Sequence, residues 1–121
     1  MELEPKPEAI HRARRFVRTR VADYVATEHV EVAELLTSEL VTNAIIHTGA
    51  PVELCVAVDV GHVRVEVSDD SDEPPVLRGE LDPFAIHGRG LQFVEELATV
   101  WGVDTKRGAG KCVWFEIDLA G

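Results

Sequence analysis

The stretch ELVTNAIIH, residues 39–47, decides the fold, because it places an acid, an amide and an imidazole on a segment with the composition of a buried helix. Residues four apart share one face of a helix, so Glu39, Asn43 and His47 form a single polar line. Burying an unpartnered carboxylate or amide costs on the order of several kcal/mol. The line therefore faces either solvent or a polar cavity, and the helix alone favours solvent.

Length and composition are typical of one globular domain. The chain has 121 residues, of which 45% are hydrophobic and 28% charged, and we expect a single domain over 1–121 with a flexible N-terminus at 1–7. The sequence contains no long apolar run or leader, which predicts a cytoplasmic protein that does not enter a membrane. A net charge of -10 argues against nucleic-acid binding, because phosphate contacts need a surplus of Lys and Arg.

Hydrophobic periodicity around this helix predicts an α+β domain. The predicted helices span 8–26, 30–47 and a segment from Arg89, and the predicted strands span 52–58, 63–67, 100–105 and 113–119. The order of these elements favours a two-layer sandwich, in which a mixed, mainly antiparallel sheet is covered on one face by helices. The acidic, Pro-rich segment 69–83 breaks every period, and its length favours a binding loop or lid.

The first predicted helix carries a cluster of basic residues. Five of the twelve Lys and Arg residues fall within residues 11–20. A solvated basic face is the simpler interpretation, and an acidic partner surface is the alternative. The cysteines, Cys55 and Cys112, and the tryptophans, Trp101 and Trp114, are interpreted as packing residues of strands.

Two features later in the chain change the interpretation of residues 39–47. Asp69 follows a predicted strand, where its carboxylate can accept a hydrogen bond from an exocyclic amine such as that of adenine. Gly88, Arg89 and Gly90 precede a predicted helix, where glycines let backbone N–H groups approach phosphate oxygens. Each feature is weak alone, because Asp is common at strand ends and Gly-x-Gly is common in tight turns.

Taken together and in order, the motifs resemble the GHKL (Bergerat) ATP-binding fold. They are ELVxNAxxH on a helix, VxVxD at a strand end, a loop, GRGLxxV, and GxGKxxW before the last strand. More closely, the set resembles bacterial anti-sigma-factor serine/threonine kinases and related small ATP-binding regulators. The resemblance covers nearly the whole chain. It implies ATP and Mg²⁺ as ligands, and a sigma factor and an anti-sigma-factor antagonist protein as partners.

The resemblance also implies a role for each position that matches a family motif. Asn43 would be the Mg²⁺ ligand, Glu39 the base that activates an acceptor hydroxyl, and Asp69 the residue that reads adenine. Hard oxygen ligands suit Mg²⁺, and a Glu one turn before Asn43 would lie close to the transferred phosphoryl group. The other implied nucleotide contacts are His47, Ser71, Gly88, Arg89, Gly90, Leu91, Gly110 and Lys111.

Two positions depart from the family pattern and keep alternatives open. Ser71 stands where the family commonly has Gly, and Lys111 stands where it often has Thr. The favoured function is an anti-sigma factor with serine/threonine kinase activity, and the alternative is a nucleotide-sensing binding module without catalysis. A sensor histidine kinase fragment is disfavoured, because no helical hairpin with a phosphoacceptor His is expected before residue 39. Formation of a homodimer is left open.

Overall fold

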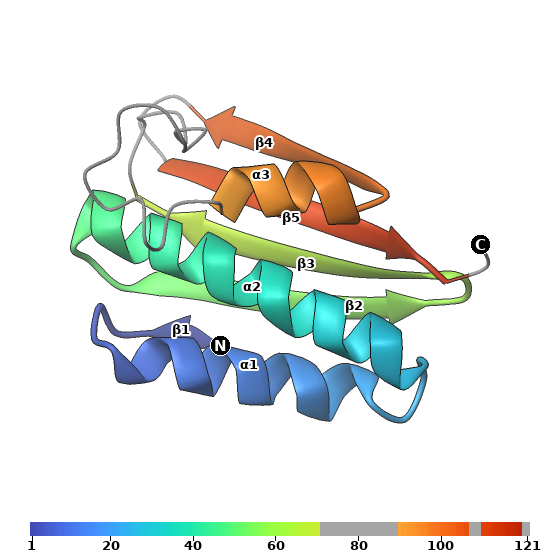
Figure 1. Cartoon of the computed structure of the whole chain (residues 1–121). Helices are drawn as coiled ribbons and strands as arrows, with labels where there is room; N and C mark the ends of the chain where they lie inside the picture. Colours follow the sequence, from blue (N-terminus) through green and yellow to red (C-terminus); the bar gives the residue numbers. More distant parts are fainter. Residues whose placement is uncertain (71–89, 107–109, 120–121) are drawn as a thin grey trace.

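The computed structural model describes residues 1–70, 90–106 and 110–119 (Figure 1). Its elements, in chain order, are β1 (Glu2–Leu3), α1 (Glu8–Val21), α2 (Thr27–Thr48), β2 (Val52–Asp59), β3 (His62–Asp69), α3 (Gly90–Leu97), β4 (Val100–Lys106) and β5 (Gly110–Asp118). The predicted helices and strands are all found. None of the helices within these ranges is both long enough and apolar enough to cross a bilayer.

The strands form one sheet in the order β1-β2-β3-β5-β4. Every pairing between described strands is antiparallel, so the parallel component expected of a mixed sheet is not found among them. Two of these pairs are hairpins: β2 and β3 are joined at Gly61, which has φ 97°, and β4 is joined to β5. This topology brings the end of β3 beside the start of β5.

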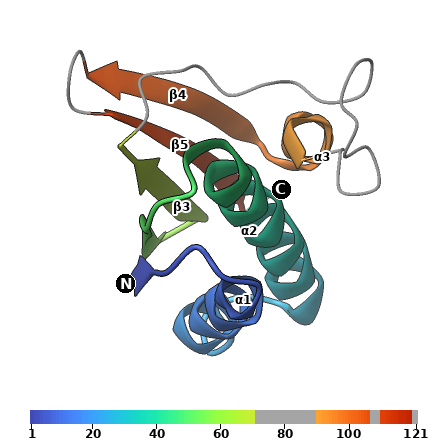
Figure 2. The same ribbon diagram turned by 90° about the vertical axis from the view of Figure 1, so that its left-hand side faces the viewer.

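The helices lie together on one face of the sheet, as the sequence predicts (Figure 2). Helix α2 crosses the middle of the sheet over β3, with α1 on one side and α3 on the other (Figures 1 and 2). The core between the layers contains apolar side chains from both, and the largest buried ones include Leu36, Leu54, Val65 and Phe115. The broad apolar surface of α2 is explained by this central position.

The N-terminus corrects one expectation. We expected residues 1–7 to be flexible, but β1 pairs with β2, and Leu3 is fully buried in the core. The terminal ammonium of Met1 donates a hydrogen bond of 2.8 Å to the carbonyl oxygen of Leu54, and the N–H of Leu54 donates one of 2.8 Å to the Met1 oxygen. A short sequence with one buried apolar residue gives no periodicity from which this strand could be predicted.

The helix ends differ from the predictions in one informative way. Gly49 caps the C-terminus of α2 with φ 60°, and its N–H donates to the carbonyl oxygen of Ile45, as the sequence predicts from a Gly followed two residues later by Pro51. Helix α1, in contrast, ends at Val21 instead of continuing to residue 26. Tyr24, which has the spacing of the buried stripe, is therefore 72% exposed.

The outer face of the sheet carries Trp114, Cys55 and Cys112, which alternate with core residues, whereas Trp101 is paired with Phe115 and packs against the core. Trp114 packs over Gly102, where a Cβ atom would lie 2.6 Å from the indole ring, and the Arg64 guanidinium lies 4.1 Å from the ring centroid. Cys55 is exposed, so its interpretation as a packing residue is wrong. Cys112 is half-buried, and burial raises the pKa of its thiol.

Candidate functional site

One end of the molecule gathers the ends of several elements. The C-terminal half of α2, the last residue of β3, the first residues of β5 and the start of α3 lie at this end in Figure 1. The polar residues singled out from the sequence are carried by these elements. The fold therefore brings together, from distant parts of the chain, groups that the sequence analysis assigned to one site.

The polar line of α2 lies at the boundary of the core. Leu36, Leu40 and Val41 of the same helix are buried against the sheet. Asn43 is buried, at 6% exposure, and Glu39 is half-buried. The solvent-facing interpretation of this line is therefore wrong for Asn43.

The buried carboxylate at the end of β3 forms an ion pair with a lysine of β5. Asp69 and Lys111 are paired in the sheet register, on the face that also carries Val67 and Val113. The ammonium Nζ of Lys111 lies 3.1 Å from Oδ1 and 3.0 Å from Oδ2 of Asp69. The exposed fractions of the two side chains are only 3% for Lys111 and 0% for Asp69. The cation thus lies almost symmetrically across the carboxylate that was predicted to read a base.

Gly110 is required by the close approach of two backbones. Its φ is 86°, and a Cβ atom there would lie 2.0 Å from the carbonyl oxygen of Asp69 and 2.9 Å from Cα of Asp70. No side chain fits at that distance, and L-residues rarely adopt that backbone angle. The last glycine of GxGK is therefore needed for the close packing of the two backbones. This packing places Lys111 directly opposite Asp69.

Charge and hydrogen-bonding capacity at this end suit the edge of a purine. A carboxylate accepts hydrogen bonds only, and an ammonium donates them only. The Watson–Crick edge of adenine has a donor amine at N6 beside an acceptor at N1, so Asp69 and Lys111 together offer the complementary pair of groups. An amine of a base that approached Asp69 would meet the ammonium already there, so the cation must shift for the base to bind.

Several of the predicted site residues lie outside the described part of the structure. These are Ser71, Gly88 and Arg89. Gly90 and Leu91 begin α3, and His47 lies in α2, but the side chains of Leu91 and His47 are not among those described. The described contacts join Asp69, Gly110 and Lys111, and Glu39 and Asn43 lie on the C-terminal half of α2, the helix that ends at the same end of the sandwich.

The ion pair was missed in the sequence, although a signal for it exists. Lys111 is on the same face of its strand as Val113, Phe115 and Ile117, whose side chains point into the core. A lysine in register with core residues predicts a buried cation, and a buried cation needs a partner. Asp69 is on the core face of its own strand, as Val65 and Val67 show, and could have been identified as that partner.

Comparisons with known proteins agree with this architecture. The sequence model of a family described as histidine kinase-like ATPase domain matches residues 3–117. The histidine kinase domain of the Erythrobacter litoralis EL346 blue-light activated histidine kinase is similar in structure, with a TM-score of 0.58 and 23% identity, over 93% of this chain and 60% of that one. A second structure of the Erythrobacter litoralis EL346 kinase gives a TM-score of 0.61 and 24% identity, over 93% of this chain and 41% of that one.

The family model defines the family of this chain, and the structural matches cover only part of each kinase chain. The chain spans 60% and 41% of the two solved kinase chains, and at these identities the likeness is one of fold. None of the curated proteins matches the sequence. The family model covers almost all residues, including the helix with the ELVTNAIIH stretch and the strands that carry Asp69 and Lys111. The chain belongs to the histidine kinase-like ATPase domain family.

Proposed function

We propose that this chain is an ATP-binding regulator with protein kinase activity, which phosphorylates a Ser or Thr of an anti-sigma-factor antagonist and also binds a sigma factor. The observation that carries the proposal is the placement of Glu39 one helical turn before the buried Asn43, at the end of the sandwich that also contains Asp69. A carboxylate, an amide oxygen and a buried base-reading acid are the groups that such a reaction needs.

The residues at this end fit Mg²⁺ and ATP by their chemistry. Asn43 offers a hard carbonyl oxygen, and Mg²⁺ commonly takes only one or two protein ligands beside phosphate oxygens and water. Asp69 would accept the exocyclic amine of adenine, and Lys111 would donate to the neighbouring ring nitrogen once it has moved aside. ATP supplies the γ-phosphoryl group for transfer.

Glu39 has the position and the chemistry for a general base. Its half-buried carboxylate lies on the polar line of α2, a turn away from the proposed Mg²⁺ ligand. In the proposed reaction, the acceptor hydroxyl oxygen bonds to the γ-phosphorus while the bond to the β,γ-bridging oxygen breaks. Glu39 takes the hydroxyl proton, which leaves the acceptor as a phosphate ester and ADP as the other product.

A nucleotide-sensing module without catalysis is the second candidate, and the Lys111–Asp69 ion pair favours it. A buried ammonium on the carboxylate opposes nucleotide binding, because the exocyclic amine must compete with a full positive charge. A protein with such a pair would bind nucleotide weakly and respond to changes in nucleotide concentration. In this alternative, occupancy of the site controls partner binding and no phosphate is transferred.

Calorimetric titration with ATP and Mg²⁺ tests the shared part of both candidates. The wild-type protein should bind ATP, and Asp69→Asn should weaken binding strongly, because an amide that presents its N–H₂ repels the amine of adenine. Binding that is unchanged in Asp69→Asn would contradict the site. Thermal melts of both proteins are needed as a control, because the substitution also removes the charge that pairs with Lys111.

Transfer of labelled phosphate separates the two candidates. The protein is incubated with labelled ATP and the antagonist proteins encoded near its gene, and Glu39→Ala is compared with the wild type. The kinase proposal expects Ser or Thr phosphorylation that Glu39→Ala abolishes while ATP affinity is kept. Glu39→Gln serves as the matched control, because it keeps the shape of the side chain and removes only the base. ATP binding without transfer to any of these proteins would favour the module.

A further inference from the structure

We propose that the free part of the β2 edge binds an extended, acidic segment of a partner protein, which adds to the sheet as a further strand. The site lies between β2 and the C-terminal end of α1. It is separate from Asn43 and Asp69, and the proposal does not depend on nucleotide binding. Its elements are an unpaired strand edge, a groove beside that edge with both apolar and charged walls, and a basic helix that flanks the groove.

The edge is open because β1 covers only part of β2. The β1 pairing reaches Val52 and Glu53, and the bonds with Met1 extend it to Leu54. Among the described strands, none pairs with the remaining residues 55–59 on that side. These five residues span roughly 16 Å at the usual strand rise, which is enough for one short strand of a partner.

The hydrogen-bonding direction of this edge follows from the bonds to Met1. Leu54 directs both its N–H and its carbonyl oxygen toward β1. Backbone groups alternate in direction along a strand, so Val56 and Val58 direct theirs toward the open edge, while Cys55 and Ala57 face β3. An added strand would therefore bond to the backbones of Val56 and Val58.

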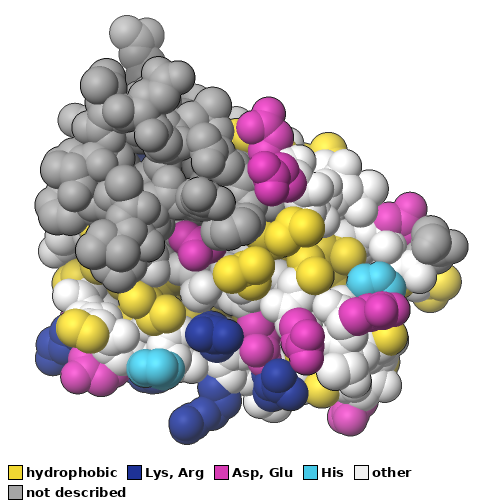
Figure 3. Space-filling model, viewed as in Figure 1, with side chains coloured by type: hydrophobic (Ala, Val, Ile, Leu, Met, Phe, Trp, Pro, Cys, Tyr) yellow, Lys and Arg dark blue, Asp and Glu magenta, His cyan; other side chains and the backbone are white. Residues whose placement is uncertain are grey.

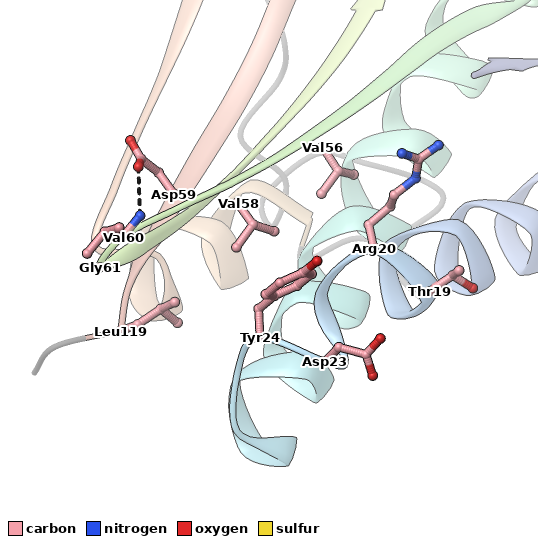
Figure 4. Close-up of a pocket in the computed structure, with 10 residues that line it drawn as sticks. All are labelled: Thr19, Arg20, Asp23, Tyr24, Val56, Val58, Asp59, Val60, Gly61 and Leu119. Atoms are coloured by element: carbon pink, nitrogen blue, oxygen red, sulfur yellow. Dashed lines mark hydrogen bonds between the residues drawn. The ribbon is translucent and has the colours of Figure 1, made fainter.

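The same two residues form the apolar part of a groove that also has charged walls. A hollow of about 930 Å³ is formed by Thr19, Arg20, Asp23, Tyr24, Val56, Val58, Asp59, Val60, Gly61 and Leu119. In Figure 4, the side chains of Val56 and Val58 point toward Arg20 and Tyr24 across this hollow. Tyr24 is 72% exposed and Val60 is 98% exposed. Alternate apolar side chains of an added strand would fill the groove while its backbone bonds to the edge, as in other cases of strand addition.

Charge decides which kind of segment fits. Arg20 lies beside Val56, and its guanidinium is held over the Phe16 ring at 4.6 Å. Beyond it, Arg12, Arg14 and Arg15 are exposed along α1, and Figure 3 shows Lys and Arg side chains along this part of the surface. Asp59 lies at the opposite end of the groove, and Asp23 lies on its α1 side, after Arg20. A bound segment should therefore have its carboxylates at the Val56 end, where they would lie near Arg20.

A second copy of the chain fits less well than such a segment. Antiparallel pairing of two β2 edges would place both helical layers on the same face of the joined sheet, with the two α1 helices next to each other. Each α1 carries five arginines and one glutamate, so this arrangement would bring like charges together. A narrow extended segment with carboxylates avoids that repulsion and uses the same edge.

The test uses a fluorescent synthetic peptide that has four Glu residues followed by alternating Val and Thr. Fluorescence anisotropy should detect binding to the wild-type protein. Val58→Lys should weaken it about tenfold or more, because a charge would enter the apolar groove, and Arg20→Glu should weaken it similarly. Val100→Lys is the matched control, because Val100 is 44% exposed at the start of β4, on the other edge of the sheet, and it should leave affinity unchanged.

Two further probes make the outcome specific for strand addition. Two peptides are compared, one N-methylated at the odd-numbered residues and one at the even-numbered residues. Their affinities should differ, because only one of these two sets donates N–H groups to β2. A peptide with four Lys in place of Glu should bind poorly to the wild type and recover with Arg20→Glu. Absence of binding, equal binding by both N-methylated peptides, or no effect of Val58→Lys would overturn the proposal. A dimer in sedimentation velocity that Val58→Lys dissociates would instead identify a second copy as the occupant.

Discussion

Two of the ion pairs in the described part of the molecule join elements that are distant in sequence and differ sharply in burial. Lys111 and Asp69 link β5 to β3 with side-chain exposures of 3% and 0%. Arg18 and Glu34 link α1 to α2, and their side chains are 54% and 10% exposed. Both pairs bring a cation into hydrogen-bonding contact with a carboxylate. Their contributions to stability should nevertheless differ widely, because solvent screens one pair and is excluded from the other.

The difference lies in what remains when one partner is lost. A surface ion pair gains little, because water and salt can replace either partner. In a buried pair, the remaining group is an uncompensated charge in a medium of low polarity, and this state is costly even where the intact pair is nearly neutral for stability. The pair at the end of β3 is thus a poor source of net stability but a strong constraint on both residues. The same constraint opposes entry of a base.

The largest effect is expected for Asp69→Ala. This change leaves the Lys111 ammonium buried without its carboxylate, and removal of one partner of a buried pair costs about 3–5 kcal/mol. Urea denaturation followed by circular dichroism measures the change in the free energy of unfolding. The double variant Asp69→Asn with Lys111→Met removes both charges and should recover most of the loss. A double variant as unstable as Asp69→Ala would contradict the role of the unpaired charge.

Gly110→Ala should have the next largest effect, because it acts on the backbone that sets the pair. The new Cβ atom would lie 2.0 Å from the Asp69 carbonyl oxygen, at a φ of 86°. Steric overlap and backbone strain together should cost about 3 kcal/mol. Thermal denaturation measures this loss. Gly61→Ala is the matched control: its φ is 97°, but nothing lies within 4 Å of the added Cβ, so it carries only the backbone strain.

The features that depend on local sequence pattern could be predicted, and those that depend on contacts between distant residues could not. Periodicity and motif order were sufficient for the helical layer, the hairpins and the cap at Gly49, since these depend on local pattern. The polar line of α2 was recognised because three residues share a spacing. Alternation along each strand places both Lys111 and Asp69 on the core face, but their pairing also depends on the register between two strands whose paired residues are 42 apart in sequence, which the alternation does not specify. The end of α1 was predicted wrongly, because no Gly or Pro marks the turn after Val21.

Lys111→Thr tests whether the buried cation opposes nucleotide binding. Threonine removes the positive charge from Asp69 but keeps a hydroxyl that can donate to a ring nitrogen. We expect ATP to bind about tenfold more tightly, which corresponds to about 1.4 kcal/mol. The change also leaves the Asp69 carboxylate buried without its partner, which should lower the stability of the protein. The affinity is therefore measured by calorimetric titration well below the melting temperature. Lys111→Met lacks the donor and is the control. Unchanged or weaker binding by Lys111→Thr would mean that the ammonium does not compete with the base.

The smallest effect is expected for Arg18→Ala, at the exposed pair. Arg18 is 54% exposed, and its hydrogen bond to Glu34 raises the pKa of the guanidinium, so the guanidinium stays charged at every pH used for folding measurements. Screening by solvent should limit the fall in Tm to no more than about 3 °C. The fall should shrink further in about 1 M salt, where the Debye length is about 3 Å. The loss in Asp69→Ala should not change with salt, because the ions cannot reach that pair. Melts of both variants at low and high salt measure the contrast, and equal salt dependence would show that the two pairs are not distinguished by burial.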